Sequence, residues 1–326
     1  MRKDERECIQ IVYSCNDAYI KQAGVSLISL FETNSSLPII EVSFIGDTLS
    51  QESIEKIKNI GIKYRVKIAF YELKNIIPNI LKSSELDRHP LTIYSKIFVN
   101  KIARAEKILY IDCDCIICNS LGELLKIDFS NNCIAGVQMP YSNLWKEKNN
   151  ISSTSPYICD GVVLFYMPNW KKYRCEEKSI KFINKYQGHP PNLSEGTLNY
   201  VCQNQIYLLA PEYNLMSTML VMNSYKIKKL YGTFSYYTEE ELIYAKQSPK
   251  IVHYLNELFI RPWFRNSEHP KKLYYLQYYY MSPWKKERLK KGKFNIKHRI
   301  HRYILQFFPT SMLDFYLKVF KKKRLK

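Results

Sequence analysis

The chain has 326 residues, 46% of them hydrophobic and 24% charged, a composition typical of a globular protein and not of a disordered one. Its net charge is +19; it has only 10 glycines and contains neither G-x-G-x-x-G nor G-x-x-x-x-G-K followed by Ser or Thr, which argues against a glycine-rich phosphate loop. No stretch reaches the roughly 20 apolar residues of a membrane-spanning helix, and the charged N-terminal segment MRKDERECIQ predicts no signal peptide.

The first third of the chain alternates between strand-like and helix-like patterns. Short apolar runs predict strands, and apolar residues at helical spacing predict helices. The predicted strands span residues 9–15, 39–46 and 67–73, and the predicted helices span 18–34, 50–62 and 95–103. This alternation predicts an α/β fold, in which a mostly parallel sheet carries helices on both faces.

Two aspartates interrupt the next apolar run, KILYIDCDCIIC (107–118), which predicts a buried strand. Strand side chains alternate between faces, so Asp112 and Asp114 are expected on one face and Cys113 and Cys115 on the other. Carboxylates are rarely buried without a partner or a metal ion, and parallel sheets bind ligands at the carboxyl ends of their strands. The pair therefore predicts a divalent-cation site. A surface D-x-D loop is the alternative.

The chain contains nine cysteines, an odd number whose spacing shows no disulfide framework. This pattern predicts reduced thiols in a cytoplasmic protein. A zinc site at Cys113, Cys115 and Cys118 is the alternative, but no nearby cluster of cysteine and histidine supplies a fourth ligand.

The alternation loosens in the second half of the chain. The predicted strands there span residues 131–138, 157–167, 205–214 and 250–255, and a predicted helix spans 178–187. The last strand carries His253, whose imidazole, added to two carboxylates, shifts a hard-cation site toward manganese. Such an ion would neutralise charge on a leaving diphosphate. A histidine packed in the core is the alternative.

The C-terminal segment is basic and amphipathic. From Lys285 onward the chain has 15 Lys and Arg against 2 Asp and Glu. A predicted helix over 295–308 places its apolar residues on one face, and a second apolar and then basic element follows at 311–326. The apolar residues of the predicted helix are Ile296, Ile300, Tyr303, Ile304, Phe307 and Phe308. The pattern predicts binding to an anionic membrane surface; a helix packed on the domain is the alternative. No nucleic-acid-binding module is visible.

Five stretches in fixed order resemble glycosyltransferase family 8, the retaining enzymes that include bacterial lipopolysaccharide galactosyl- and glucosyltransferases and glycogenin. They are IVYSCNDAYIKQAGVSLISL, LTIYSKIFVNKIARAEKILYIDCDCII, YICDGVVLFYMPNW, EGTLNYVCQNQIYLLAPEYN and VHYLNELFIRPWF, and they span residues 9 to about 264. The resemblance implies a GT-A fold and a nucleotide-sugar donor, usually a uridine diphosphate (UDP) sugar, used with Mn²⁺ or Mg²⁺.

The same resemblance implies roles for single residues. Asp112, Asp114 and His253 match the metal ligands of the family. Tyr19 matches the aromatic residue that stacks on uracil, and Asn16 stands where the family often has an aspartate that contacts uracil. Lys96 matches a basic residue that contacts the donor, although a solvated helix residue is its alternative role.

The sequence departs from the family pattern at three places. Cys159 and Asp160 replace an amide and a small residue, and Ser194–Gly196 replaces a D-Q-D block. The basic residue before P-W, Arg261, lies eight positions after His253, further than in the galactosyltransferases, but it can still grip phosphate.

Two of the replaced positions carry carboxylates that we assign to catalysis, Asp160 and Glu195. Glu195 is a nucleophile, a ligand of a sugar hydroxyl or an acceptor-positioning group, and the pattern favours sugar positioning.

These observations predict a GT-A domain at 1–265 and a basic, membrane-associating region at 266–326. The predicted protein is a retaining hexosyltransferase on the cytoplasmic face of the membrane, which moves a hexose from a UDP-sugar to a cell-surface or lipid-linked glycan. The alternatives are a catalytically inactive sugar-nucleotide or membrane-binding scaffold and a nucleotidyltransferase that releases pyrophosphate.

Overall fold

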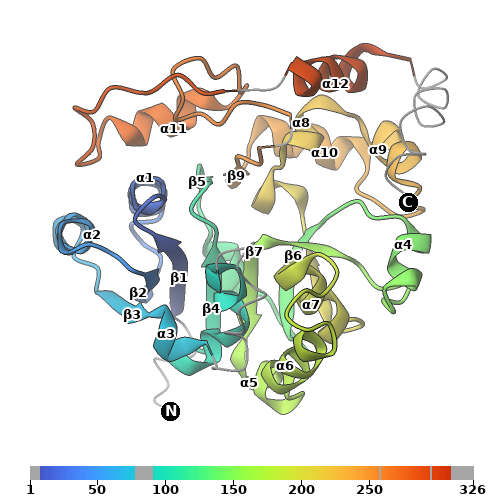
Figure 1. The fold of residues 1–326 in the computed structure, drawn as a ribbon, viewed down its shortest axis with the longest axis horizontal. Coiled ribbons are helices and arrows are strands. Elements are labelled where there is room, and N and C mark those ends of the chain that lie inside the picture. The colour runs from blue at the N-terminus through green and yellow to red at the C-terminus, as the bar shows by residue number, and fades with distance from the viewer. Residues whose placement is uncertain (1–7, 78–90, 257, 294–295, 310–326) are drawn as a thin grey trace.

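A seven-stranded mixed β-sheet runs through the protein, with helices on both of its faces (Figure 1). The computed structural model describes residues 8–77, 91–256, 258–293 and 296–309. In spatial order the strands are β3 (Ile68–Glu72), β2 (Ile39–Asp47), β1 (Ile9–Asn16), β4 (Lys107–Ile111), β7 (Ile158–Tyr166), β6 (Ile134–Gln138) and β8 (Ile206–Leu209). Only β7 runs antiparallel to its neighbours among these strands, so the predicted mostly parallel mixed sheet is confirmed.

The helices fill two apolar layers on the two faces of the sheet. The α-helices are α1 (Ile20–Thr33), α2 (Gln51–Tyr64), α3 (Leu73–Ile76), α4 (Asn143–Lys148), α5 (Met167–Lys172), α6 (Cys175–Lys185), α7 (Leu193–Val201), α8 (Ser217–Val221), α9 (Ser224–Tyr231), α10 (Glu239–Gln247), α11 (Lys272–Tyr279) and α12 (Ile296–Phe307). The 3₁₀ helices are η4 (Leu91–Ile102), η5 (Gly122–Lys126) and η6 (Pro211–Asn214). Along β1, Ile11 and Tyr13 pack in the layer of α1, whereas Val12 packs in the layer of η4, as strand alternation requires.

The predicted strand over 107–118 is wrong in one respect, because it forms two strands in two sheets. β4 ends at Ile111, and β5 (Cys115–Ile117) pairs antiparallel with β9 (Ile251–His253) in a separate small sheet. Asp112 and Asp114 thus lie on the turn between β4 and β5, where the Cys115 N–H donates to the Asp112 carbonyl (3.2 Å). Their common orientation therefore comes from this turn and not from strand alternation.

Two other predicted elements differ in type. The helix expected at 95–103 is the 3₁₀ helix η4, which is interrupted at Phe98 (φ −105°, ψ 15°) and rich in β-branched residues that disfavour an α-helix. The strand expected at 205–214 ends at Leu209, since Pro211 lacks an N–H for the ladder and opens η6 instead.

The C-terminal segment packs on the layer that contains α1, at the edge occupied by α11 and α12 in Figure 1. The ring of Trp284 fills the space above Gly24, where a Cβ atom would lie 2.4 Å from it. Residues on both sides of position 265 thus share one core, and the division into two regions at that position stays a prediction. The predicted helix over 295–308 is confirmed as α12, whereas the element predicted at 311–326 lies outside the described residues.

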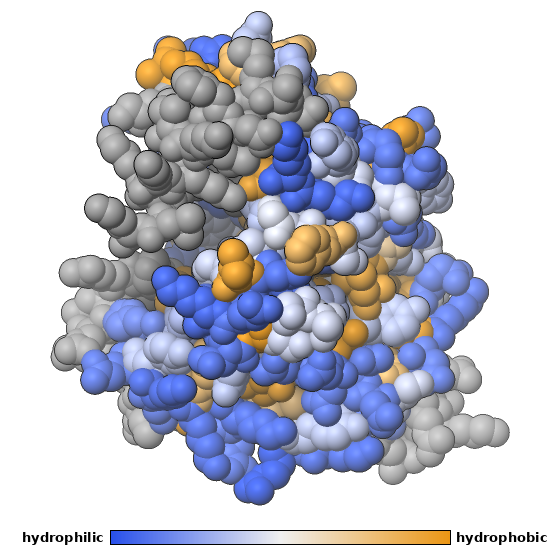
Figure 2. Space-filling view, turned by 90° about the vertical axis from the view of Figure 1, so that its right-hand side faces the viewer, coloured by the Kyte–Doolittle hydropathy of each residue, from blue (hydrophilic) through white to orange (hydrophobic). Residues whose placement is uncertain are grey.

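The described surface is mainly polar. Hydrophilic residues cover most of the face in Figure 2, with apolar side chains scattered among them. No described helix is long and apolar enough to cross a membrane.

Candidate active site

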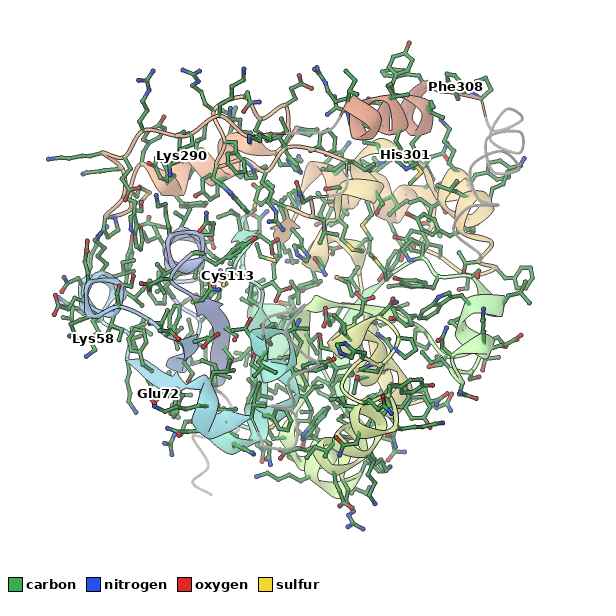
Figure 3. All side chains as sticks on the ribbon, in the orientation of Figure 1. Lys58, Glu72, Cys113, Lys290, His301 and Phe308 are labelled. Carbon is green, nitrogen blue, oxygen red and sulfur yellow. The ribbon has the colours of Figure 1, made fainter. Side chains whose placement is uncertain are left out.

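The two aspartates lie at the carboxyl end of β4, beside the end of β1. Figure 3 labels Cys113, which stands between them, near the centre of the protein. The Asp112 side chain is 32% exposed and that of Asp114 only 11%, so Asp112 faces open space while Asp114 is enclosed by its partners. This is the edge at which parallel sheets bind ligands.

The small β5–β9 sheet brings His253 to Asp114. Its register places Cys115 opposite His253, so that the His253 Nε2 lies 3.2 Å from the Asp114 Oδ1. The His253 Nδ1 lies 3.1 Å from the Asn214 Oδ1. If Nδ1 carries the proton and donates it to Asn214, the Nε2 lone pair points at the carboxylate and is free to bind a cation. In the absence of a cation, burial opposes protonation of His253, but the Asp114 carboxylate raises its pKa well above the usual value.

Lys96 joins the first aspartate to Asp160 on β7. The buried Lys96 Nζ lies 3.5 Å from the Asp112 Oδ1 and 3.0 Å from the Asp160 Oδ2, and it donates to the Asp160 carbonyl oxygen at 2.9 Å. Burial is the main cause that raises the pKa of Asp112 to about 6, with the charge of Lys96 opposing it. Lys96 is therefore a buried cation held between two carboxylates and not a solvated helix residue.

Arg261 links the second aspartate to Tyr19. Its guanidinium donates to the Asp114 Oδ2 (2.9 Å) and to the Tyr19 hydroxyl (2.8 Å). Burial would raise the pKa of Asp114, but the positive charges of His253 and Arg261 hold it below its usual value. Asn16 lies at the carboxyl end of β1, where its side chain accepts from the Ala18 N–H (3.1 Å).

A second acidic pair borders the cluster on β7 and α7. The Ser194 hydroxyl donates to the Asp160 Oδ2 at 2.5 Å. Glu195 follows in the first turn of α7, and burial, together with the charge of Asp160, raises its pKa to about 8. Glu195 is therefore mostly protonated at neutral pH, when its carboxyl group can donate a hydrogen bond.

Gly161 leaves room for the central side chains. A Cβ atom at this position would lie 2.3 Å from the His253 Cε1 and 2.9 Å from the Asp112 Oδ2. The absence of a side chain at residue 161 therefore lets the imidazole and the Asp112 carboxylate both lie next to this position.

The donor atoms at this point suit a hard divalent cation. Carboxylate oxygens with one imidazole nitrogen match Mn²⁺ or Mg²⁺. The Cys115 sulfur lies within 4.8 Å of the ligand atoms of Asp114 and His253, but burial raises its pKa well above the usual value and keeps the thiol neutral. The zinc alternative at Cys113, Cys115 and Cys118 receives no support from the geometry, because these three do not form a cluster among the described residues.

Three residues of this site were not assigned a role from the sequence: Gly161, Ser194 and Asn214. Gly161 and Asn214 lie within stretches that resemble the family, and Ser194 directly precedes one, but nothing in their local pattern distinguishes them from structural residues. Their roles depend on register between distant elements, such as η6 and β9, which a single sequence does not display.

The sequence is similar to those of several bacterial proteins. It is 24% identical to general stress protein A of Bacillus subtilis, over 82% of this chain and 91% of the relative. It is 25% identical to lipopolysaccharide 1,2-glucosyltransferase of Escherichia coli, over 67% of this chain and 66% of the relative. Identity to lipopolysaccharide 1,3-galactosyltransferase of Salmonella typhimurium is 22%, over 63% and 62% of the two chains.

The fold is that of solved glycosyltransferases. The galactosyltransferase LgtC, solved with donor and acceptor sugar analogues, aligns with a TM-score of 0.68 and 16% identity over 85% of this chain and 99% of that chain. The bifunctional glycosyltransferase WbbM aligns with a TM-score of 0.71 and 14% identity over 88% of this chain and 52% of that one. The predicted GT-A fold is thereby confirmed.

The sequence profile of the family described as "Glycosyl transferase family 8" matches residues 10–267, the greater part of the chain. The match includes β1, the D-x-D turn, β7, α7 and β9, the elements that build the site. The predicted family and the predicted enzyme class are both confirmed. The protein belongs to glycosyl transferase family 8 and is a hexosyltransferase.

Proposed function

We propose that this hexosyltransferase moves a hexose from a UDP-sugar to a cell-surface glycan, such as lipopolysaccharide or capsule, and retains the anomeric configuration. The observation that carries the proposal is the pairing of Asp114 with His253 at the carboxyl edge of the sheet, where Asp112 and His253 both border Gly161. Lys96 and Arg261 place two further positive charges at the same point, as a diphosphate requires. The lipopolysaccharide glucosyl- and galactosyltransferases among the relatives support a glycan acceptor.

In this proposal Asp112, Asp114 and His253 hold Mn²⁺ or Mg²⁺. The bound ion would neutralise charge on the diphosphate that leaves. The three side chains supply oxygen and nitrogen donors, and Gly161 provides the room that they need. Arg261 now occupies Asp114, so ion binding would release its guanidinium to grip the diphosphate in bidentate fashion.

The uridine would bind beside β1. The Tyr19 side chain is 38% exposed, which leaves its ring open for stacking on a base, and its hydroxyl is already joined to Arg261. Asn16, at the end of the same strand, offers an amide for the uracil edge. The base would thus lie at the end of β1 and the diphosphate beside Arg261, at the same edge of the sheet.

The transferred sugar would lie next to Asp160 and Glu195. Lys96 and Ser194 fix the Asp160 carboxylate, which can then accept hydrogen bonds from sugar hydroxyls. Glu195, with a pKa of about 8, is a weak nucleophile at neutral pH because its carboxyl group is largely protonated. This favours a sugar-positioning role for Glu195 and front-face attack by the acceptor while UDP leaves.

The C-terminal helices would dock on an anionic membrane, where lipid-linked glycan acceptors lie. Along α12, Ile296, Ile300, Tyr303 and Phe307 are 54–66% exposed and form one stripe, while Leu305 is buried on the opposite side. Between α11 and α12, a run of exposed cations adds charge: Lys285, Lys286, Arg288, Lys290, Lys291 and Lys293. An apolar stripe beside exposed cations is the combination that anionic interfaces attract. The protein would therefore lie peripherally on the inner face of the membrane.

A donor-hydrolysis screen tests the proposed reaction. The purified chain is incubated with a panel of nucleotide sugars, with Mn²⁺ or with a chelator, and nucleoside diphosphate release is measured. We expect Mn²⁺-dependent release of UDP from one UDP-sugar. Release of pyrophosphate, or release from a non-uridine donor alone, would contradict the proposal. If no donor is hydrolysed, calorimetry that detects no metal-dependent UDP binding would also contradict it.

A further inference from the structure

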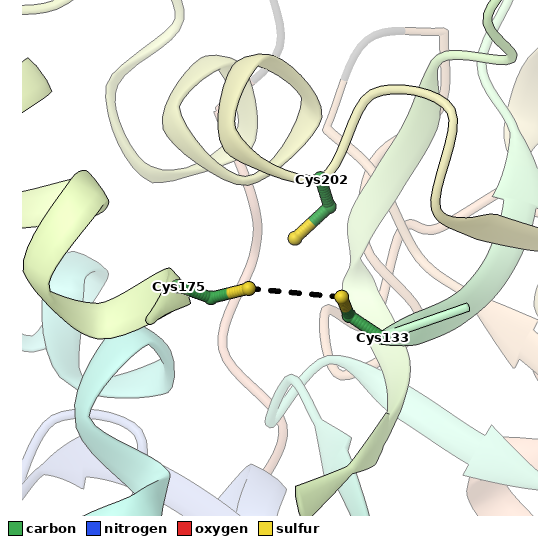
Figure 4. Close-up of side chains that lie close together, drawn as sticks. All are labelled: Cys133, Cys175 and Cys202. Carbon is green, nitrogen blue, oxygen red and sulfur yellow. Dashed lines mark hydrogen bonds between the residues drawn. The ribbon is translucent and has the colours of Figure 1, made fainter. Parts of the chain in front are cut away.

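Three cysteines from distant parts of the chain converge in the interior (Figure 4). They form a group separate from that of Asp114 and His253, which together with Asp112 are here called the carboxylate cluster. Cys133 precedes β6, Cys175 is the first residue of α6, and Cys202 caps the end of α7. All three are fully buried, and their sulfur atoms lie within 4.8 Å of one another. We propose that these three thiols, here called the cysteine cluster, bind one structural Zn²⁺ ion.

The sulfur spacing is close to that of a zinc site. In a tetrahedral site with Zn–S bonds of about 2.3 Å, two sulfurs are separated by about 3.8 Å. The Cys133 and Cys175 Sγ atoms are 3.6 Å apart, and the Cys202 Sγ lies within 4.8 Å of both. A small side-chain rotation of Cys202 would complete a three-sulfur face.

The backbone around the cluster is fixed. The Cys133 N–H donates to the Gln205 carbonyl (2.8 Å), and its own carbonyl accepts from the Tyr166 N–H (2.9 Å). The Cys133 thiol donates to the Gln205 Oε1 (3.4 Å), so this oxygen lies beside the cluster. We assign this neutral amide oxygen to the fourth position of the tetrahedron.

Zinc binds cysteine as the thiolate, so the three thiols must lose their protons when the ion binds. Cys175 lies at the positive N-terminal end of α6, an 11-residue helix. Binding would release the three thiol protons to water and leave a ZnS₃ centre with one negative charge, which Lys178 and the end of the helix offset.

An ordinary packing role is the competing explanation, since reduced cysteines behave as small apolar side chains. The cysteine cluster does lie in an apolar layer, which also contains Trp170, Ile183 and Leu198. Packing alone, however, does not require three sulfurs at one point. The consequence of a zinc ion would be to tie β6 and α6 to α7, the helix that carries Glu195.

The test uses the full chain produced with Zn²⁺ and then dialysed against a chelator that clears weakly held ions from the carboxylate cluster. We expect one retained zinc ion per chain, and Zn K-edge X-ray absorption with three sulfur neighbours and one oxygen. Less than a tenth of an ion retained, or a shell of oxygen and nitrogen alone, would overturn the proposal. A Cys133–Cys175 disulfide in the intact-protein mass of the purified chain would also overturn it.

Matched variants separate the cysteine cluster from the carboxylate cluster. Cys175→Ala and Cys202→Ala should each abolish zinc retention, whereas Cys115→Ala, which alters a thiol beside Asp114 and His253, should retain it. Equal retention in all three variants would overturn the proposal. If the Ala variants do not fold, the X-ray absorption spectrum of the unaltered chain still decides, because it counts sulfur neighbours directly.

Discussion

The carboxylates and imidazole of Asp112, Asp114 and His253 lie at the open carboxyl edge of the sheet, whereas the thiols of the cysteine cluster are sealed between β6, α6 and α7. The first set offers hard oxygen and nitrogen donors, with Asp112 32% exposed. The second offers sulfur donors that are fully buried.

This difference separates two uses of a metal ion. An ion that must enter and leave with a substrate needs accessible, hard ligands and open coordination positions. An ion that is part of the fold needs ligands that are closed to solvent. The following predictions test the first half of this comparison, from the largest expected effect to the smallest.

Asp114→Asn should reduce metal-dependent UDP release by about 10³-fold. The amide keeps the shape of the side chain but removes the negative charge that holds His253, Arg261 and the proposed ion. Steady-state rates measure the loss. Glu240→Gln makes the same chemical change at an exposed position on α10 and should leave the rate unaltered; equal losses in the two variants would contradict the assignment.

Gly161→Ala should weaken metal-dependent UDP binding by about 10²-fold, because the added Cβ would lie 2.3 Å from the His253 ring. Isothermal calorimetry measures the affinity. The matched control is Gly122→Ala, where the nearest atom would be the Ser120 Oγ at an ordinary 3.5 Å. Wild-type affinity in Gly161→Ala would show that the imidazole and the Asp112 carboxylate do not share a ligand.

Asn214→Ala should raise the Mn²⁺ concentration needed for half-maximal activity by about 10–100-fold. The loss follows because the His253 Nδ1 lies 3.1 Å from the Asn214 Oδ1, and an Nδ1–H donated to this oxygen leaves Nε2 for the ion. The rate at saturating Mn²⁺ should recover, which a general folding defect would not permit. A lowered rate that excess Mn²⁺ does not rescue would argue against a positioning role.

Removing the exposed stripe of α12 should lower membrane binding by about tenfold per residue, the effect of one large apolar side chain leaving the interface. Phe307→Ser, with 60% of the residue exposed, should reduce co-sedimentation with vesicles that contain anionic lipid, and UDP release in solution should not change. Ile62→Ser removes an apolar residue that is 74% exposed on α2 and should have no effect on vesicle binding. Equal binding by the two variants would remove the membrane assignment.

The pH profile should show the smallest effect, a loss of about half the activity as the pH reaches the pKa of Glu195, about 8. Burial raises this pKa above the usual value for a glutamate, so the folded protein holds the proton over a range in which the unfolded chain has released it. The contribution of Glu195 to the free energy of unfolding therefore decreases as the pH rises from the pKa of this group in the unfolded chain to its pKa in the folded protein, about 8. Glu195→Gln should remove the loss of activity at alkaline pH. If the loss is unchanged in this variant, a group other than Glu195 causes it.

The sequence was sufficient to predict the layered α/β fold, because the N-terminal half repeats strand and helix patterns whose periods differ. The D-x-D turn was located for a partly wrong reason. Asp112 and Asp114 were expected to share one face of a single strand, but their carboxylates are placed by the turn that separates β4 from β5. A buried apolar run with two carboxylates nevertheless indicated a site, since such groups require partners wherever the strand ends.

The residues that escaped prediction are those fixed by long-range register. Asn214 reaches His253 through the packing of η6 on β9, and Cys133 and Cys175 meet although they are 42 positions apart. Local spacing instead drew attention to Cys113, Cys115 and Cys118, which do not gather in the part of the chain that the structure describes. Spacing along the chain indicates a metal site only when the ligands share one turn or helix.

Electron paramagnetic resonance of Mn²⁺ gives the most direct test of the claim that Asp112, Asp114 and His253 hold a cation for the diphosphate. The signal of free Mn²⁺ is followed as the protein is added with UDP or with uridine. We predict that the protein takes up one ion per chain, more tightly with UDP than with uridine, and that Asp112→Asn with Asp114→Asn abolishes this uptake. Equal uptake of Mn²⁺ by the double variant and the unaltered protein would contradict the account. So would uptake that is equally tight with UDP and with uridine.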